Sequence, residues 1–169
     1  LISNLGIEKT EVWATKLVSN FARTPQGNDR SQLMAVANGL ADVAIANTYY
    51  IGIMLAGKGG EEQLKAARKL KIAFPNQDNR GAHVNISGGG ILKHSPNKDN
   101  AEKFLEFLLT KEAQTHIVNN SFEYPVIDTI SPHPIIAAFG DFKMDKTSVA
   151  DFGKYNPEAV KLMDRAGWK

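Results

Sequence analysis

The sequence predicts an α/β domain, and three observations lead to this fold class. Patterns typical of amphipathic helices precede and follow a short, fully apolar run at residues 43–46, and such alternation is characteristic of α/β folds. Polar residues bound that run, as expected of a strand covered on both faces of a sheet. The chain has 169 residues, of which 43% are apolar, so it is large enough to bury a core.

The chain opens with two predicted helices. Apolar residues recur at helical spacing through residues 8–23, and Pro25 and Gly27 then end the pattern. A second helix is expected to open at Asp29, where Gln32 three residues later completes an aspartate version of the capping box. Asp29 is therefore expected to cap its own helix.

Further helices and strands are expected along the rest of the chain. Helices are predicted where apolar residues recur every three or four positions, and strands where short apolar runs lie between polar or glycine-rich segments. The predicted order is a strand at 43–46, helices at 49–56 and 61–70, strands at 71–75 and 83–87, helices at 100–109 and 111–118, and a last helix that Asn156 caps and Pro157 opens.

Composition excludes several classes of function. Lys and Arg total 20 against 18 Asp and Glu, giving a net charge of +2 with scattered basic residues, so no nucleic-acid partner is expected. The absence of cysteine excludes disulfides, zinc–thiolate sites and cysteine nucleophiles. No apolar run approaches the roughly 18–20 residues of a membrane span. No acid–base pair or supported nucleophile stands out, so the sequence does not predict an enzyme.

Two other motifs have weak support as sites. The glycine triplet at residues 88–90 lacks the lysine and hydroxyl residue of a phosphate-binding loop, so a hinge or bulge is the better interpretation. The four histidines show no spacing typical of a zinc site, and each is expected to be a surface or hydrogen-bonded residue. They are His83, His94, His116 and His133.

Tyr49 and Tyr50 are the residues that stand out. The chain has four tyrosines, and these two are adjacent where the predicted strand turns into a helix, the corner at which α/β domains present side chains to ligands. A trivalent hard cation favours anionic oxygen and can ionise a phenol whose ordinary pKa is about 10. Two phenolates would therefore suit ferric iron. From the residues alone, the alternative is a pair that packs on the core with its hydroxyls at the surface.

Four blocks of the sequence together carry a family resemblance. They are residues 42–50, which read Asp-Val-Ala-Ile-Ala-Asn-Thr-Tyr-Tyr, and residues 21–27, 80–88 and 123–126. These blocks resemble the periplasmic ferric-iron-binding proteins of ABC transporters, in particular the cyanobacterial-type Fut/Idi iron-uptake branch. The resemblance implies an α/β lobe of a class II periplasmic-binding-protein-like fold, in which helices flank a mixed sheet. It also implies that the upstream lobe of this fold is missing from this chain. In such folds the ligand is held between two lobes that close about a hinge.

The resemblance also implies a function and a metal site. Tyr49 and Tyr50 match the paired metal ligands of the C-terminal lobe, Asn47 matches a position lining the same cleft, and Thr48 lies between them. The implied function is capture of ferric iron (Fe3+) and its delivery to an ABC transporter permease, in the periplasm or at a membrane anchor facing it, without catalysis.

A second implied feature concerns anions. Gly27, Asn28 and Asp29 fall where related ferric proteins hold a synergistic carbonate or phosphate at a helix N-terminus. A carboxylate at that position would cap the helix and repel a bound anion. We therefore expect iron binding that requires no synergistic anion.

The resemblance divides the chain into three parts. Residues 1–85 would form most of the C-terminal lobe with the iron site, residues 86–120 the return crossing and helices that pack on the N-terminal lobe, and residues 121–169 a segment returning to the C-terminal lobe. Because the chain begins at Leu1 without a methionine, it is expected to be processed or part of a longer protein. The missing N-terminal half is expected as another chain or segment, since an apolar face would otherwise stay uncovered.

Two alternative functions stay open at this point. The first is a related class II binding protein for another small ligand, such as thiamine or a polyamine, although no carboxylate cluster of the kind that polyamines need is evident near the tyrosine pair. The second is the effector-sensing domain of a transcription regulator, which would require a helix-turn-helix upstream. Tyr124 and Tyr155 match no ligand position and are expected to be structural.

Overall fold

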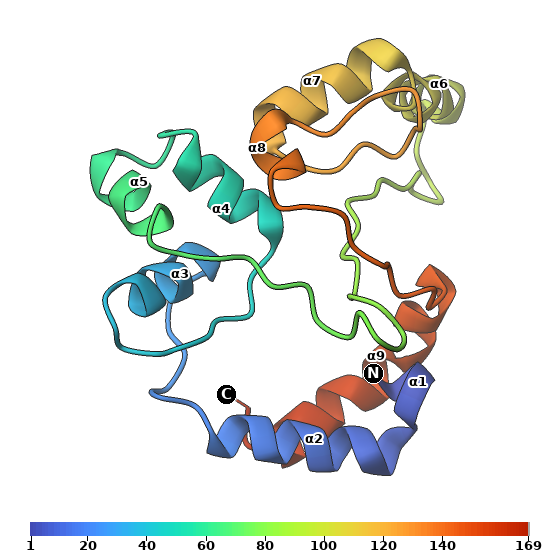
Figure 1. Cartoon of the computed structure of the whole chain (residues 1–169). Helices are drawn as coiled ribbons and strands as arrows, with labels where there is room; N and C mark the ends of the chain where they lie inside the picture. Colours follow the sequence, from blue (N-terminus) through green and yellow to red (C-terminus); the bar gives the residue numbers. More distant parts are fainter. Residues whose placement is uncertain (169) are drawn as a thin grey trace.

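Helices supply the regular structure of residues 1–168, the part of the chain that the computed structural model describes (Figure 1). Irregular segments join them across the middle of the molecule. Most helices lie close to their predicted positions, whereas α1 and α8 are short additions that no sequence pattern indicated. The helices are α1 (Ile2–Leu5), α2 (Ile7–Ser19), α3 (Asp29–Ala37), α4 (Thr48–Leu55), α5 (Glu61–Ala67), α6 (Lys98–Leu108), α7 (Lys111–Ser121), α8 (Pro134–Ala137) and α9 (Val149–Arg165).

The expected mixed sheet is not formed by residues 1–168. Their β pairing consists of one parallel bridge between Ala82 and Met144, in which the Ala82 N–H donates to the Lys143 carbonyl and the Asp145 N–H donates to the Ala82 carbonyl, both at 2.8 Å. A ladder needs two extended segments side by side in register. Within the described residues, none of the three predicted strands pairs with another; they are 43–46, 71–75 and 83–87.

The beginning and the end of the described chain pack together. Helices α1 and α2 lie against α9, and their shared core consists of Ile2, Ala14, Leu162 and Ala166. In Figure 1 these helices form the lower part of the molecule. The C-terminal segment thus returns to residues at the start of the chain.

Helix α9 begins well before the predicted start. The Ser148 hydroxyl caps it by accepting the Ala150 N–H at 3.3 Å, and Pro157 lies inside the helix. Asn156 is therefore helical, and the prediction that it caps the helix is wrong. Packing of the neighbouring Tyr155 against the core shared with α2 helps to hold these turns, which offsets the hydrogen bond that proline removes.

A second core lies beneath α3, α4 and α5. It consists of Leu33 from α3, Ile51 and Met54 from α4, and Ala66 and Ala67 from α5. Met54 is completely buried. Because α4 contributes its most buried residues here, this core determines how the start of α4 is presented.

Gly52 brings α4 against α8. A Cβ atom at Gly52 would lie 2.9 Å from the Phe122 Cβ and 2.9 Å from the Ile136 Cδ1, closer than real Cβ contacts. Phe122 and Ile136 are themselves fully buried. No side chain fits at position 52 unless α4 moves away from these two residues.

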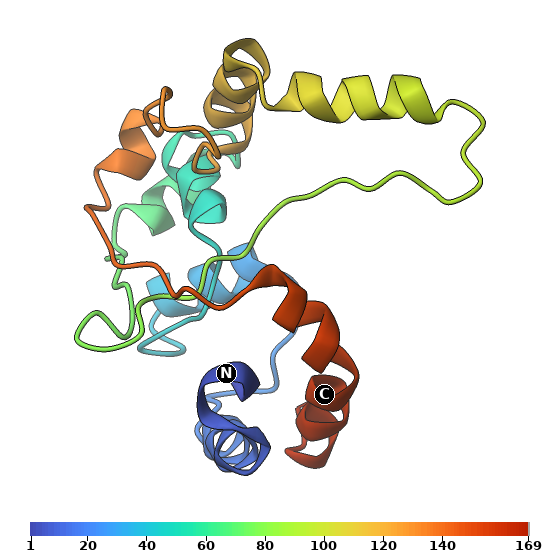
Figure 2. The ribbon, with the colours of Figure 1, turned by 90° about the vertical axis from the view of Figure 1, so that its right-hand side faces the viewer.

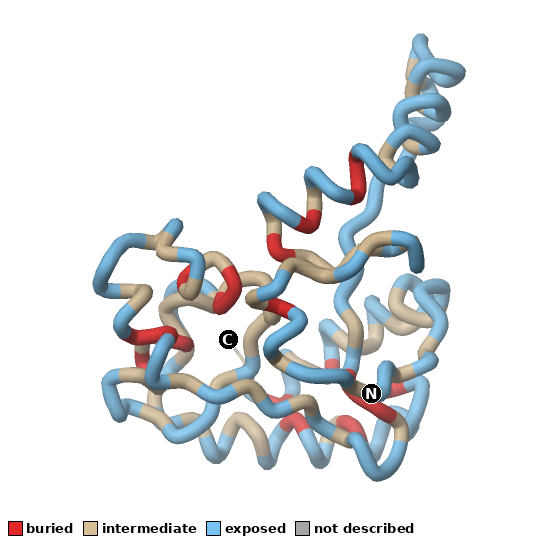
Figure 3. The backbone as a smooth tube through the Cα atoms, turned by 45° about the horizontal axis from the view of Figure 1, so that its top comes forward, coloured by how far each residue is buried: buried red, intermediate tan, exposed pale blue. Residues whose placement is uncertain are grey.

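Residues 86–97 and α6 form an arm that extends away from the rest of the molecule (Figure 2). Helix α6 has no buried residue, and its main packing partner is α7. Phe104 and Phe107 are exposed on it and lie near each other. Figure 3 shows the same arm as almost wholly exposed backbone. This arm buries little apolar surface within the described residues.

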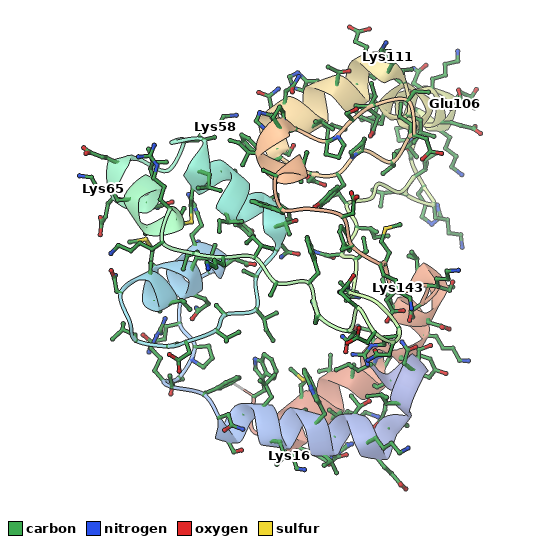
Figure 4. All side chains as sticks on the ribbon, in the orientation of Figure 1. Lys16, Lys58, Lys65, Glu106, Lys111 and Lys143 are labelled. Carbon is green, nitrogen blue, oxygen red and sulfur yellow. The ribbon has the colours of Figure 1, made fainter. Side chains whose placement is uncertain are left out.

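Basic side chains are spread over the molecule. Lys16, Lys58, Lys65, Lys111 and Lys143 lie on well-separated parts of it (Figure 4). Of these, Lys58 packs over the Phe122 ring, 4.8 Å from its centroid.

None of the helices in residues 1–168 combines the length and the apolar character that crossing a membrane requires.

Asp145 links three segments of the chain. Its Oδ1 accepts from the Thr147 N–H at 2.8 Å and from the Thr147 hydroxyl at 2.6 Å, and its Oδ2 accepts from the Asn4 amide at 3.2 Å. The Arg80 guanidinium lies 3.5 Å from Oδ2. The Thr147 hydroxyl, above all, holds the pKa of Asp145 below its ordinary value, with help from the Thr147 N–H, Asn4 and Arg80.

We expect Asp145→Ala to lower the free energy of unfolding at pH 7 by about 1.5–3 kcal/mol, the range for hydrogen bonds to a charged group. A carboxylate whose pKa is lowered by folding stabilises the protein above its unfolded pKa of about 4, and this stabilisation is lost as the pH falls through the folded pKa. Urea unfolding of wild type and variant at pH 7 and at pH 2–3 measures this. The difference in free energy of unfolding between the two proteins should shrink in acid. A difference that does not depend on pH would contradict the assignment.

Candidate functional site

The two predicted metal ligands meet at the start of α4. Asn47 is extended, with φ −75° and ψ 140°, and Thr48 begins the helix, so Tyr49 and Tyr50 lie in its first turn. Their ring centroids are 4.4 Å apart, with the ring planes tilted by 41°. Both residues and Thr48 are half-buried, and Tyr50 also packs against the core beneath α3, α4 and α5. The side chains of this neighbouring pair therefore lie together, with one ring supported by the core.

The surroundings of Tyr49 keep its phenol protonated. Its pKa is raised to about 12, mainly by the hydrogen bond with the Tyr50 side chain, then by burial, and further by electrostatic repulsion from Tyr50, Asp29 and Glu123. At neutral pH the phenol is therefore neutral. A cation bound beside the pair would act in the opposite direction, because it lowers the free energy of the phenolate.

A hydrogen-bonded network holds the residue that precedes α4. The Asp29 Oδ1 accepts from the Asn47 backbone N–H at 2.8 Å and from the Asn47 side-chain amide at 3.2 Å. The Asn47 Oδ1 in turn accepts from the Asn85 amide at 3.1 Å. The structure thus brings the side chains of Asp29 and Asn47 together.

The start of α3 differs from its prediction by one residue. Asn28, not Asp29, is the N-cap: its Oδ1 accepts the Ser31 N–H at 3.2 Å, and Ser31 completes the capping box in place of Gln32. Gly27 precedes it with a φ of 83°, a backbone conformation that glycine adopts without strain. Because Asn28 caps the helix, the Asp29 carboxylate is free to bind Asn47.

Sequence reasoning missed Glu123 as part of this region. Its charge contributes to the raised pKa of Tyr49, and its Oε2 accepts from the Ser87 hydroxyl at 2.7 Å. No local pattern indicates this, because Glu123 follows α7 and is far from the tyrosines in the sequence. Its block was singled out only through the family resemblance, which assigned it no role.

The remaining candidate ligands do not converge. Residues 1–168 hold no group of three or more histidine, cysteine or acidic side chains that could bind a metal. His133 caps α8, where its Nδ1 accepts the Ile135 N–H at 3.2 Å, and His83 packs against Phe152. Within the described residues, the phenol oxygens of the tyrosine pair are thus the candidate metal donors.

The fold is similar to solved structures of iron-binding proteins. A Trichodesmium protein, IdiA or FutA, solved in complex with iron and citrate ligands, matches with a TM-score of 0.92 and 46% identity over 99% of this chain and 53% of that one. The ferric binding protein from Campylobacter jejuni matches with a TM-score of 0.95 and 38% identity over 99% and 53% of the two chains. These neighbours confirm the class II binding-protein lobe.

Sequence comparison agrees. Iron uptake protein A1 of Synechocystis is 46% identical over 164 residues, which are 97% of this chain and 45% of that protein. The chain therefore spans about half the length of the relatives it matches. The family model described as bacterial extracellular solute-binding protein matches residues 3–115. On this evidence the chain belongs to the bacterial extracellular solute-binding proteins.

Proposed function

We propose that this chain forms the C-terminal lobe of a ferric-iron-binding protein, which captures Fe3+ between two lobes in the periplasm and delivers it to an ABC importer. The observation that carries the proposal is the contact between the Tyr49 and Tyr50 rings, 4.4 Å apart, in the first turn of α4. Relatives named for iron uptake and ferric binding, similar over nearly the whole chain, support the choice of metal.

Ferric iron suits this pair because it is a hard, trivalent cation. Binding would replace the protons of both phenols, including that of Tyr49, whose pKa of about 12 leaves it neutral beforehand. The nearby carboxylates of Asp29 and Glu123 add negative charge that favours a cation at this place. Because the chain offers two phenol oxygens, further ligands are expected from the opposite lobe.

We assign that opposite lobe to a part of the protein upstream of this chain. Apolar surface is exposed among residues 1–168 at Val43 and Ile45, at Ile86 and Leu92, and on α6, which has no buried residue. A second lobe would bury these surfaces, and its strands would pair with the segments of this chain that are predicted to be strands. In this arrangement residues 1–85 form most of the C-terminal lobe and carry the iron site, and residues 86–120 pack on the other lobe. Residues 121–169 return to the C-terminal lobe.

The test is a ferric titration of the protein expressed from its complete gene. Two tyrosinate ligands should produce a visible charge-transfer band that saturates with one iron per protein. Absence of the band together with binding of thiamine or a polyamine would instead favour the related small-molecule receptors.

We expect the band to survive in buffer stripped of carbonate and phosphate. Asp29 and Glu123 both place negative charge near Tyr49, and that charge opposes an additional anion. The Trichodesmium structure contains citrate as well as iron, so citrate serves as the added anion in a parallel titration. Loss of the band in anion-free buffer, and its return with carbonate, phosphate or citrate, would contradict this expectation.

A further inference from the structure

Asp29 makes an unusual contact for a residue at the start of a helix. Its carboxylate points away from its own helix, α3, and accepts both the backbone and the side-chain N–H groups of Asn47, 18 residues later in the chain. Asn47 immediately precedes α4 and the tyrosine pair. One carboxylate oxygen therefore holds two donors of the residue at which the chain turns into α4.

We propose that Asp29 is a positioning residue for the metal site: by holding Asn47, it fixes the turn into α4 and thereby the directions in which Tyr49 and Tyr50 point. The proposal rests on the proposed function, since it concerns the same site. It assigns to Asp29 a role in orienting ligands, in place of the helix capping that the sequence indicated.

The start of α4 needs such an anchor. The Asn47 side chain makes no capping hydrogen bond to α4, so the first turn is held at this end by backbone contacts, including the Tyr50 N–H to the Asn47 carbonyl at 3.2 Å. The Asn47 amide instead spans Asp29 and Asn85. A buried or half-buried N–H without a partner is costly, so removal of the Asp29 acceptor would let Asn47 seek another conformation.

The base of the anchor is rigid. Helix α3 packs on both α4 and α5, and its Leu33 is buried in the same core as Ile51 and Met54 of α4. Asn28 and Ser31 cap α3, which leaves the Asp29 carboxylate available to Asn47. Residues that orient metal ligands typically change metal affinity by roughly 10- to 100-fold when mutated, and Asp29 would act in this way through Asn47.

Two substitutions at Asp29 separate its hydrogen bonds from its charge. Asp29→Asn keeps an oxygen that can accept both donors of Asn47 and removes the charge, whereas Asp29→Ala removes both. If Asp29 acted through its negative charge alone, the two variants would bind iron equally weakly. Positioning predicts that alanine weakens iron binding about 10- to 100-fold, while asparagine stays within about threefold of wild type.

The experiment uses the protein expressed from its complete gene and has three readouts for each variant. Ferric affinity is measured by competition with the chelator EDTA, the tyrosinate band by visible absorption, and protection of the Asn47 amide by hydrogen exchange in the iron-free protein. Glu8→Ala, which removes an exposed first-turn acidic residue of α2, is the matched control and should leave all three unchanged. Thermal melting shows whether each variant is folded.

We expect Asp29→Ala to lower the affinity, shift the band and expose the Asn47 amide to exchange, and Asp29→Asn to retain all three properties. The inference is overturned if Asn47 stays protected in Asp29→Ala, or if alanine and asparagine weaken binding equally. If wild type shows no ferric band, the proposed function fails, and the exchange of Asn47 still decides whether Asp29 holds the turn. If Asp29→Ala does not fold, the comparison of Asp29→Asn with wild type decides: a loss of Asn47 protection or of affinity in Asp29→Asn overturns the inference.

Discussion

Replacement of Tyr49 or Tyr50 by phenylalanine is expected to weaken ferric binding by more than about 100-fold and to remove or strongly shift the visible tyrosinate band. Each substitution deletes one oxygen that would bind the metal, and loss of a ligand costs more than loss of the partners that orient ligands, which is roughly 10- to 100-fold. Ferric titration with EDTA as competitor measures the affinity, and the absorption spectrum reports the ligands.

Tyr155→Phe is the matched control for this experiment. Tyr155 is half-buried like the pair, but it packs in the separate core shared by α2 and α9, beside Lys154. The Tyr155→Phe variant should show the same tyrosinate band and the same ferric affinity as wild type. A double variant lacking both hydroxyls of the pair that still binds iron with an unchanged spectrum would disprove the metal site.

The 169 residues produced alone are expected to self-associate and to increase the fluorescence of a hydrophobic dye several-fold. Val43 is 81% exposed, Ile45 71% and Leu92 78%, although all three are strongly apolar. Exposed apolar patches and backbone groups without ladder partners promote association between chains. Size-exclusion chromatography and dye titration measure both effects.

The control for this experiment is the protein expressed from its complete gene. If a second lobe covers these surfaces, the longer protein should be monomeric and should bind little dye. A 169-residue chain that is monomeric, binds no dye and melts cooperatively would contradict the assignment of these surfaces to a lobe interface.

The helices were largely predictable because their signals are local. Apolar spacing located α4 to α7 within a few residues, and it also placed the tyrosine pair at the start of α4. The exceptions are helix starts that depend on contacts elsewhere. Asn156 and Pro157 look like a helix beginning, yet α9 continues through them because Tyr155 packs on a core formed with α2.

The parts that could not be predicted depend on pairs of residues far apart in the sequence. Segment 43–46 has the apolar pattern of a buried strand, but no local pattern shows which segment would pair with it, and within residues 1–168 none does. The same applies to the bond from Asn47 to Asp29 and to the position of Glu123 near Tyr49. Only the resemblance, not the spacing, had grouped Asp29 with the tyrosines.

The absence of a side chain at Gly52 affects how α4 can be oriented. Phe122 and Ile136 approach the α4 backbone at Gly52, two and three positions after Tyr50 and Tyr49 in the same helix. An added methyl group would force α4 away from these two residues and so change the directions in which the Tyr49 and Tyr50 hydroxyls point. Under the proposed function, a substitution at Gly52 would therefore change the affinity for iron although residue 52 does not contact the metal.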